Sequence, residues 1–122
     1  MENRPILIVD DHPPTAAFLG AALQAGGYQT VVARDGFEGV RMARDHLPAL
    51  IFMDFLLPEL SGLATGRMIR SEEMLSDIPM VAMTAFPFQE GEELFLGEGF
   101  DGYLPKPIDI RTLLATAARF CG

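Results

Sequence analysis

In the stretch Ala49-Leu-Ile-Phe-Met-Asp54, five apolar residues lead directly to a carboxylate. A short apolar run without polar alternation is typical of a strand buried on both faces, as in a parallel sheet. Four other segments of the chain have the same character. The five predicted strands are Pro5–Val9, Gln29–Ala33, Ala49–Met53, Pro79–Met83 and Asp101–Leu104.

Longer segments with a helical period of apolar residues lie between these strands. The predicted sheet-facing stripes are Phe18, Leu19, Ala22 and Leu23; then Phe37, Val40, Ala43 or Arg44, and Leu47; and finally Ile110, Leu113, Leu114, Ala117, Ala118 and Cys121. Helix starts are predicted at Pro13-Pro14, Asp35-Gly36, Ser61-Gly62 and Asp109, and Gly26-Gly27 suits a helix end. The alternation of strand and helix, repeated five times, predicts an α/β fold with a doubly wound parallel sheet, and one domain over residues 1–122.

Composition and charge restrict the classes of function. The chain has 122 residues, of which 49% are hydrophobic, and a net charge of −8. This acidic balance argues against direct binding of nucleic acid, which needs a basic surface. Cys121 is the only cysteine, so no intrachain disulfide can form, and a reducing compartment is favoured. No apolar run is long enough to span a membrane and no signal peptide is evident, so we expect a cytoplasmic protein without membrane insertion.

Polar residues stand where the predicted strands end. Asp10 and Asp11 follow the first strand, Asp54 the third, Thr84 the fourth and Lys106 the fifth. Because ligands of open α/β sheets bind outside the carboxyl ends of the strands, we expect these side chains to meet at one edge. Each of them alone is more often a solvated or capping group. Their common placement is what indicates a functional site.

Carboxylates packed together repel one another, and a hard divalent cation such as magnesium resolves that repulsion. Lys106 is the only lysine among nine basic residues, and its compact ammonium suits a phosphoryl anion. An aspartate that attacks phosphorus forms an aspartyl phosphate. These residue types therefore indicate a metal-dependent site for a transferred phosphoryl group. His12 is expected to be exposed and not to bind the metal, and His46 is expected to lie on the surface near a helix end.

Four motifs in order resemble the receiver domain of two-component response regulators over essentially the whole chain. They are Ile6-Leu-Ile-Val-Asp-Asp11, Phe52-Met-Asp54-Phe-Leu-Leu-Pro58-Glu-Leu-Ser-Gly62, Met83-Thr84-Ala85 and Gly99-Phe-Asp-Gly-Tyr103-Leu-Pro-Lys106-Pro107. The resemblance implies a flavodoxin-like strand order 2-1-3-4-5. It also implies a phosphorylation-activated switch that catalyses its own phosphorylation but is not an enzyme with turnover on a separate substrate.

The same resemblance implies the roles of the site residues. Asp54 would accept phosphate from a histidine kinase or a histidine phosphotransfer protein. Asp10, Asp11, Asp54 and the backbone carbonyl of Leu56 would bind Mg²⁺, with Mn²⁺ as a possible substitute. Lys106 would contact the phosphoryl group.

The resemblance further implies how the signal is read. Thr84 would move toward the phosphoryl group and Tyr103 would turn inward behind it, with a cis bond between Lys106 and Pro107. A downstream protein or output domain would then recognise the face formed by the fourth helix, the fifth strand and the last helix. We expect a monomer or a weak homodimer. No output domain is recognisable in this chain, and the cognate kinase, stimulus and output are not predicted.

Two positions depart from well-known members of the family, which carry polar side chains there. Leu56 stands two residues after Asp54, and Phe86 stands two residues after Thr84. Apolar groups cannot orient an attacking water by hydrogen bonds, so we expect slow loss of phosphate. Leu57 stands where methionine is frequent in the family, and we expect this mild change to have no effect on function. Phe86 and Phe88 either pack over the sheet or form a partner surface in a short helical segment.

Three other functions are weighed against the switch. A phosphorylation-independent scaffold would keep the fold without phosphate transfer, but every expected site position is filled. A phosphatase of the haloacid-dehalogenase type needs a second aspartate two residues after its nucleophile, whereas Asp10 is followed by Asp11 and His12, and Asp54 by Phe55 and Leu56. A flavodoxin-like cofactor site needs a phosphate loop rich in glycine, serine or threonine after the first strand. Asp10-Asp11-His12-Pro13-Pro14 stands there instead, and its two carboxylates would repel a phosphate.

Overall fold

The computed structural model describes residues 3–85, 93 and 95–121 of the chain. Five parallel strands form one sheet in the order β2-β1-β3-β4-β5, which confirms the predicted fold class and strand order. The strands are β1 (Ile6–Val9), β2 (Thr30–Ala33), β3 (Leu50–Asp54), β4 (Met80–Thr84) and β5 (Gly102–Pro105). The order places β1 and β3 side by side near the centre of the sheet.

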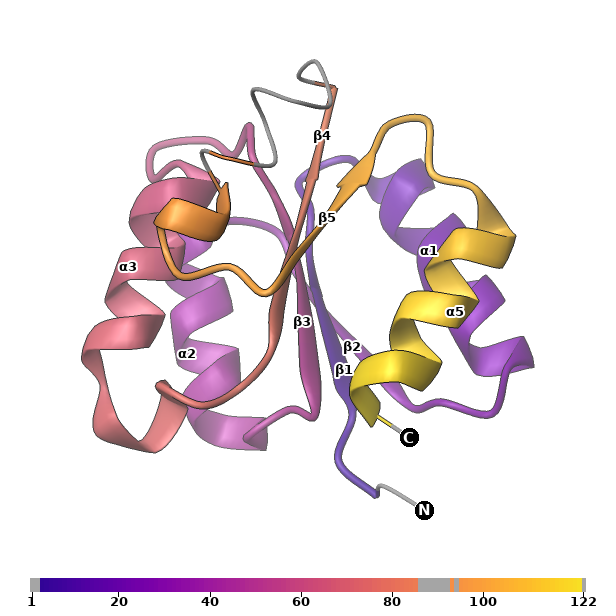
Figure 1. Ribbon diagram of the computed structural model, residues 1–122, viewed down its shortest axis with the longest axis horizontal. Coiled ribbons are helices and arrows are strands. Elements are labelled where there is room, and N and C mark those ends of the chain that lie inside the picture. The colour runs from indigo at the N-terminus through magenta and orange to yellow at the C-terminus, as the bar shows by residue number, and fades with distance from the viewer. Residues whose placement is uncertain (1–2, 86–92, 94, 122) are drawn as a thin grey trace.

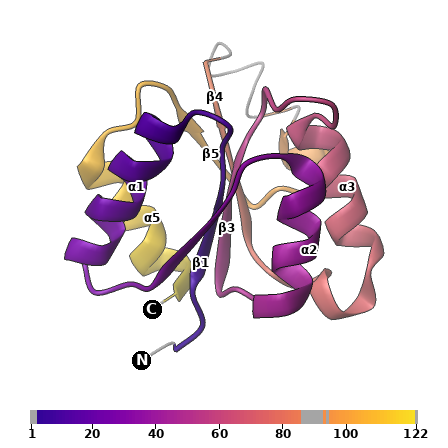
Figure 2. The same ribbon diagram turned by 180° about the vertical axis from the view of Figure 1, so that it is seen from behind.

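The helices cover both faces of this sheet. The helices whose bounds lie within the described residues are α1 (Pro13–Ala25), α2 (Gly36–His46), α3 (Gly62–Ser71) and α5 (Ile110–Cys121), with a short 3-10 helix, η1, at Glu73–Leu75. Helices α1 and α5 lie together on one face, and α2 and α3 lie together on the other (Figures 1 and 2). Two apolar cores follow from this layering, one under each helix pair. None of the described helices has the length and hydropathy needed to cross a membrane.

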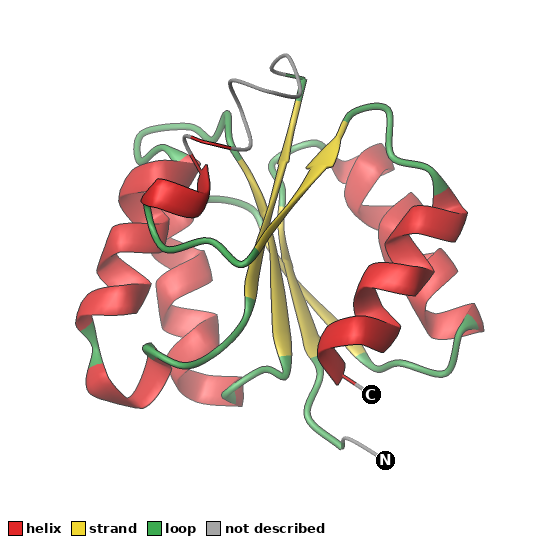
Figure 3. Ribbon diagram, in the orientation of Figure 1, coloured by secondary structure: helices red, strands yellow, loops and turns green. Residues whose placement is uncertain are grey.

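Each strand begins one residue later than the apolar runs predict, although the first residue of each predicted run still forms a backbone hydrogen bond across the sheet. The last three strands also end one residue later. Asp54 of β3 pairs in register with Met83 of β4, and Thr84 of β4 pairs with Pro105 of β5. Two of the polar site residues therefore belong to the paired strands and not to the loops after them. Asp54 and Thr84 are thus the last residues of their strands, whereas Asp10 and Lys106 directly follow theirs. Figure 3 shows the strands, in yellow, between the helices on either side.

The predicted helix starts are confirmed. Proline begins α1 at Pro13. The Asp35 side chain accepts a 2.8 Å hydrogen bond from the backbone N–H of Glu38 at the start of α2. Ser61 accepts a 3.1 Å bond from the N–H of Ala64 in α3. Asp109 likewise accepts from the N–H of Arg111 before α5. These side chains satisfy backbone donors that a helix leaves unpaired in its first turn.

The predicted stripes are correct at their centres and wrong at their margins. Leu19, Leu23, Val40, Ala43, Leu113 and Ala117 are buried. By contrast, Phe18, Phe37 and Ile110 are 46%, 55% and 42% exposed. A helix buries only the part of its circumference that meets the sheet, and residues at the edge of that arc face solvent. Leu47 lies beyond α2, at its C-cap, with φ of 45°.

Arg70 of α3 fixes the turn that precedes β5. Its guanidinium donates hydrogen bonds to the backbone carbonyls of Gly99, Ser76 and Ile78, at 2.8 to 3.0 Å. It also donates to Asp101 Oδ2 at 2.8 Å, which in turn accepts from the N–H of Met80. One side chain thus ties α3 to the start of β4 and to the turn before β5. The expectations for Phe86 and Phe88 lie outside the described residues.

Candidate functional site

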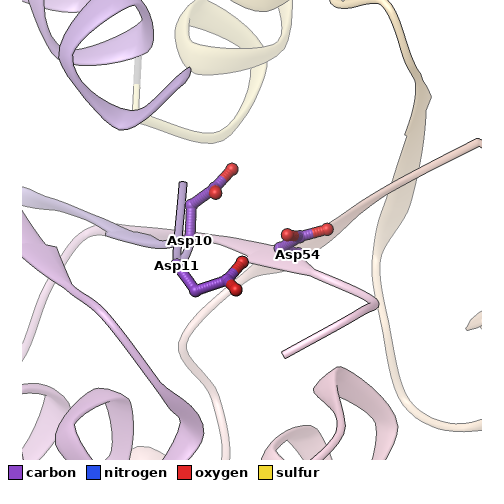
Figure 4. Close-up of side chains that lie close together, drawn as sticks. All are labelled: Asp10, Asp11 and Asp54. Carbon is purple, nitrogen blue, oxygen red and sulfur yellow. The ribbon is translucent and has the colours of Figure 1, made fainter. Parts of the chain in front are cut away.

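Three carboxylates meet at the carboxyl edge of the sheet. Asp10 and Asp11 directly follow β1, and Asp54 is the last residue of the adjacent β3. One oxygen from each of the three side chains lies within 4.8 Å of the others. Figure 4 shows the three carboxylates gathered at these two strand ends. Asp10 and Asp54 are buried, and Asp11 is exposed, so the cluster opens to solvent on one side.

The ammonium of Lys106 reaches this cluster from the end of β5. Lys106 Nζ lies 3.0 Å from Asp54 Oδ1 and 3.9 Å from Asp10 Oδ2. The two residues of the shorter pair are 52 positions apart in the chain. The structure therefore brings together Asp10, Asp11, Asp54 and Lys106, as their placement after the ends of parallel strands predicted. Their chemical roles remain predictions.

The charges in this cluster do not balance. Burial raises the pKa of the Asp54 carboxyl, and the negative charge of Asp10 raises it further. The hydrogen bond and charge of Lys106 oppose that rise, as does the backbone N–H of Leu56. Three carboxylates against one ammonium leave an excess of negative charge in a partly buried place. Such an arrangement favours binding of a cation.

One buried oxygen supports the same conclusion. Asp10 Oδ1 accepts a 2.8 Å hydrogen bond from the backbone N–H of His12. Asp10 Oδ2 is buried and has no hydrogen-bond partner among the described residues. A buried carboxylate oxygen without a donor is costly, and a metal ion would satisfy it. The donor set of oxygens only, with one side open to water, fits Mg²⁺.

Thr84 lies beside the cluster at the end of β4 and is buried. Its carbonyl oxygen accepts a 2.9 Å hydrogen bond from the N–H of Lys106. Tyr103 is half-buried in β5, its ring stacks on Phe95 with centroids 5.9 Å apart, and burial raises the pKa of its hydroxyl. The Lys106–Pro107 peptide bond is cis, as the resemblance implied. Whether Thr84 and Tyr103 act as a switch stays a prediction.

The loop after β3 supplies contacts that sequence reasoning only partly anticipated. The Leu56 side chain is 74% exposed, while its backbone N–H bonds to the Asp54 carboxylate. Gly62, which was predicted as a helix start and as the end of the motif that contains Asp54, packs against the Asp54 backbone, because a Cβ there would overlap the Asp54 carbonyl oxygen. The Ser61-Gly62 pair indicates a helix start in the sequence, but it does not indicate that Gly62 contacts Asp54. His12 and His46 are exposed, as predicted.

This arrangement of sheet and site defines the class of protein. A sequence model of the response regulator receiver domain matches residues 6–118, and the chain belongs to that family. The polar-differentiation response regulator DivK of Brucella ovis is 34% identical over 120 residues, which cover 98% of each chain.

Solved structures agree with the fold. The chemotaxis protein CheY4 of Vibrio cholerae matches with a TM-score of 0.90 and 26% identity over 98% of this chain and 99% of that one. The receiver domain of a sensor histidine kinase from Pseudomonas aeruginosa matches with a TM-score of 0.88 and 33% identity over 98% of each chain. That receiver domain has a magnesium ion coordinated in its active site cleft.

Proposed function

We propose that this receiver domain is a phosphorylation-activated switch in a two-component relay, and that Asp54 is its phosphoacceptor. The observation that carries the proposal is the 3.0 Å contact between Lys106 Nζ and Asp54 Oδ1 within a group of three carboxylates. An ammonium held against a buried nucleophile is placed to offset negative charge on an incoming phosphoryl group.

The reaction joins an Asp54 carboxylate oxygen to phosphorus and breaks the bond between phosphorus and the donor. A histidine kinase or a histidine phosphotransfer protein supplies the phosphoryl group from a phosphohistidine nitrogen, which keeps the bonding electron pair. The chain accepts one phosphoryl group and changes its own state, so it is not an enzyme with turnover on a separate substrate.

Asp10, Asp11, Asp54 and the carbonyl of Leu56 would hold Mg²⁺, or Mn²⁺ in its place. When bound, the metal offsets charge on the phosphoryl oxygens. Asp10 contributes the buried oxygen that lacks a protein donor in the described part of the chain. Lys106 supplies the remaining positive charge on the side of β5.

The proposed output passes through Thr84 and Tyr103. Thr84 would bond the phosphoryl group through its hydroxyl, and Tyr103 would turn inward behind it. The surface formed by the segment after β4, by β5 and by α5 would then bind a downstream protein or an output domain. We propose a cytoplasmic protein, monomeric or weakly dimeric, that does not bind nucleic acid directly, in keeping with its net charge of −8.

The test is the intact mass of the protein after incubation with acetyl phosphate and Mg²⁺. We expect one added phosphoryl group, and none for Asp54→Asn or without metal. Asp45→Asn, which changes an exposed aspartate of α2, should label like wild type. Absence of an adduct under conditions that label another receiver, and also with a phosphotransfer protein as donor, would favour the phosphorylation-independent scaffold.

A further inference from the structure

Four aromatic rings of the described residues form a cluster beside β5, and Phe95 lies at its centre. The Phe95 ring stacks on Tyr103, with the centroids 5.9 Å and the ring planes 24° apart. Phe55 and Phe100 meet the same ring edge-on, with centroids 5.3 Å and 5.5 Å away. Aromatic pairs in these arrangements contribute stability beyond the area that they bury. Because Phe55 directly follows Asp54, Phe95 touches both the neighbour of the proposed phosphoacceptor and Tyr103.

The cluster lies on the same face of the sheet as the Thr84 side chain. Side chains alternate between the two faces along a strand, so Thr84 points to the same face as Ala82, two residues before it. Ala82 and Phe95 belong to the core under α2 and α3, and Tyr103 packs against that core. The two residues of the proposed switch, Thr84 and Tyr103, therefore share a face with the Phe95 ring.

The position of Phe95 is maintained from the side of α3. The short helical turn that carries it is drawn in orange beside α3 (Figure 1). An ion pair joins Arg67 of α3 to Glu98 at the end of this turn, with Nη2 and Oε1 2.6 Å apart. The ring of Phe100 lies against Gly66 of α3, where a Cβ would come within 2.8 Å of it. Phe95 is thus held by contacts that do not involve the tyrosine.

The stack cannot persist unchanged when Tyr103 turns toward Thr84. A change between staggered χ1 rotamers rotates the tyrosine ring by about 120°, whereas the Phe95 ring is fully buried and held by its other neighbours. The stack therefore stabilises the position that Tyr103 has in this structure, and an inward turn costs that stabilisation.

We propose that Phe95 is a positioning residue that holds Tyr103 in the position seen here, and that phosphorylation of Asp54 separates the two rings. This inference rests on the proposed function, because it concerns the output of the same site. Phe95 thereby lowers the fraction of chains that adopt the output conformation without a phosphoryl group.

Packing alone is the simpler explanation of Phe95, since a buried ring fills the core in any case. Phe52 is also fully buried, but it belongs to the core on the other face of the sheet. If Phe95 only fills space, the change of either phenylalanine to leucine should have the same consequences. A coupling between Phe95 and Tyr103 that depends on phosphorylation is expected only from the positioning role.

The first test is a double-mutant cycle of Phe95→Leu and Tyr103→Leu, measured by denaturant unfolding. Leucine keeps apolar volume but cannot stack, so each single variant should fold with reduced stability. Without ligand, we expect a coupling of roughly two- to twelvefold in the unfolding equilibrium constant. Beryllofluoride with Mg²⁺ mimics a phosphoryl group on a carboxylate, and it should lower that coupling toward one. Phe52→Leu with Tyr103→Leu is the control cycle, which should show no coupling.

The second test observes Tyr103 directly. The chain has two tyrosines, so protein labelled with 3-fluorotyrosine gives two ¹⁹F NMR signals, which Tyr28→Phe assigns. Without ligand, the Tyr103 signal should differ between wild type and Phe95→Leu. With beryllofluoride and Mg²⁺ bound, the two signals should coincide, because the rings no longer touch. Half-saturation of Phe95→Leu should need roughly two- to twelvefold less beryllofluoride than wild type, and Phe52→Leu should not show this gain.

Three results would overturn the inference while the proposed function stands. They are absence of coupling without ligand, coupling that persists with beryllofluoride bound, and equal half-saturating concentrations in wild type and Phe95→Leu. In each case beryllofluoride with Mg²⁺ still stabilises the wild type against unfolding. If it does not, and acetyl phosphate does not label Asp54, the proposed function fails as well.

Discussion

The backbone N–H of Lys106 donates a 2.9 Å hydrogen bond to the carbonyl oxygen of Thr84. This bond joins the end of β4 to the residue that carries the ammonium of the site. The backbone position of Lys106 is therefore tied directly to that of Thr84.

Thr84→Ala should separate phosphoryl acceptance from the response to it. The substitution removes a buried hydroxyl but keeps the carbonyl that holds Lys106, so we expect the protein to remain within about 1 kcal/mol of wild-type stability. Intact mass should show near-normal phosphorylation, while phosphorylation should no longer change hydrogen exchange in residues 102–105. Thr112→Ala on exposed α5 surface should behave as wild type. An unaltered exchange response in Thr84→Ala would contradict the switch role.

Lys106→Gln should slow phosphorylation strongly without weakening the metal site. Loss of the ammonium removes positive charge that offsets the phosphoryl oxygens, and we expect a decrease on the order of 10²-fold. Mg²⁺ affinity, measured by calorimetry, should stay equal or rise, because a competing cation has left the carboxylates. Arg41→Gln removes an exposed charge on α2 and serves as the control. Weaker Mg²⁺ binding in Lys106→Gln would show that the lysine organises the metal ligands instead.

Asp10→Asn should stabilise the metal-free protein and abolish its stabilisation by Mg²⁺. The asparagine oxygen can keep the hydrogen bond from the N–H of His12, while one of the mutually repelling charges is removed. We expect a gain of about 1 kcal/mol in the free energy of unfolding without metal. Denaturant unfolding with and without Mg²⁺ measures both effects. Lower stability of the metal-free variant would mean that the Asp10 charge is compensated by Lys106 already.

Gly62→Ala should destabilise the fold and disturb Asp54. A Cβ at this position would overlap the Asp54 carbonyl oxygen and approach Phe55 Cα to 2.9 Å, and both are backbone atoms that cannot move independently. We expect a loss of about 1–3 kcal/mol. Gly20→Ala is the matched control in α1, where the nearest atom would be Thr30 Oγ1 at 3.7 Å, and it should be neutral or stabilising by up to about 1 kcal/mol. Similar unfolding curves for the two variants would refute this packing role.

Leu56→Asn combined with Phe86→Glu should shorten the life of the phosphorylated state. The exposed Leu56 side chain offers no hydrogen bond to a water that attacks phosphorus, and the sequence predicts the same for Phe86. Phosphate loss, timed by intact mass after removal of the donor, should be faster in the double variant than in wild type. Leu57→Met, which keeps an apolar side chain, should leave the rate unchanged. Equal rates for the double variant and wild type would rule out the hydrogen-bonding explanation.

The sequence pattern predicted the parallel sheet and the meeting of distant carboxylates, because the carboxyl ends of parallel strands lie at one edge. The strand order was predicted from the resemblance to receiver domains. The pattern placed each strand start one residue early. Pro5 and Pro79, for example, have no N–H to donate, and their carbonyls accept from Ala49 and Ile51 just outside the strands. It also assigned Phe18, Phe37 and Ile110 to buried faces. Periodicity gives the direction of a helix face, whereas the width of the buried arc depends on what packs against it.

The detailed features of the site depend on distances between atoms, which a pattern of residues in the sequence does not specify. The unpaired Asp10 Oδ2, the contact of Gly62 with Asp54 and the ring stacked on Tyr103 all arise from how separate segments approach one another. Residue types alone indicated that Asp54 and Lys106 belong to one site. They could not indicate which oxygen lacks a donor, or which ring lies against that tyrosine.

The single lysine of this chain also makes the site chemically distinct from the rest of the surface. Every other basic side chain is arginine, which does not react as an amine nucleophile at neutral pH, so a reagent that acylates side-chain amines has one target. Because the ammonium of Lys106 is held by Asp54, its reactivity would follow the occupancy of the site. Covalent labelling at one position could thus be used to monitor the state of the whole domain, without a tag or an added fluorophore.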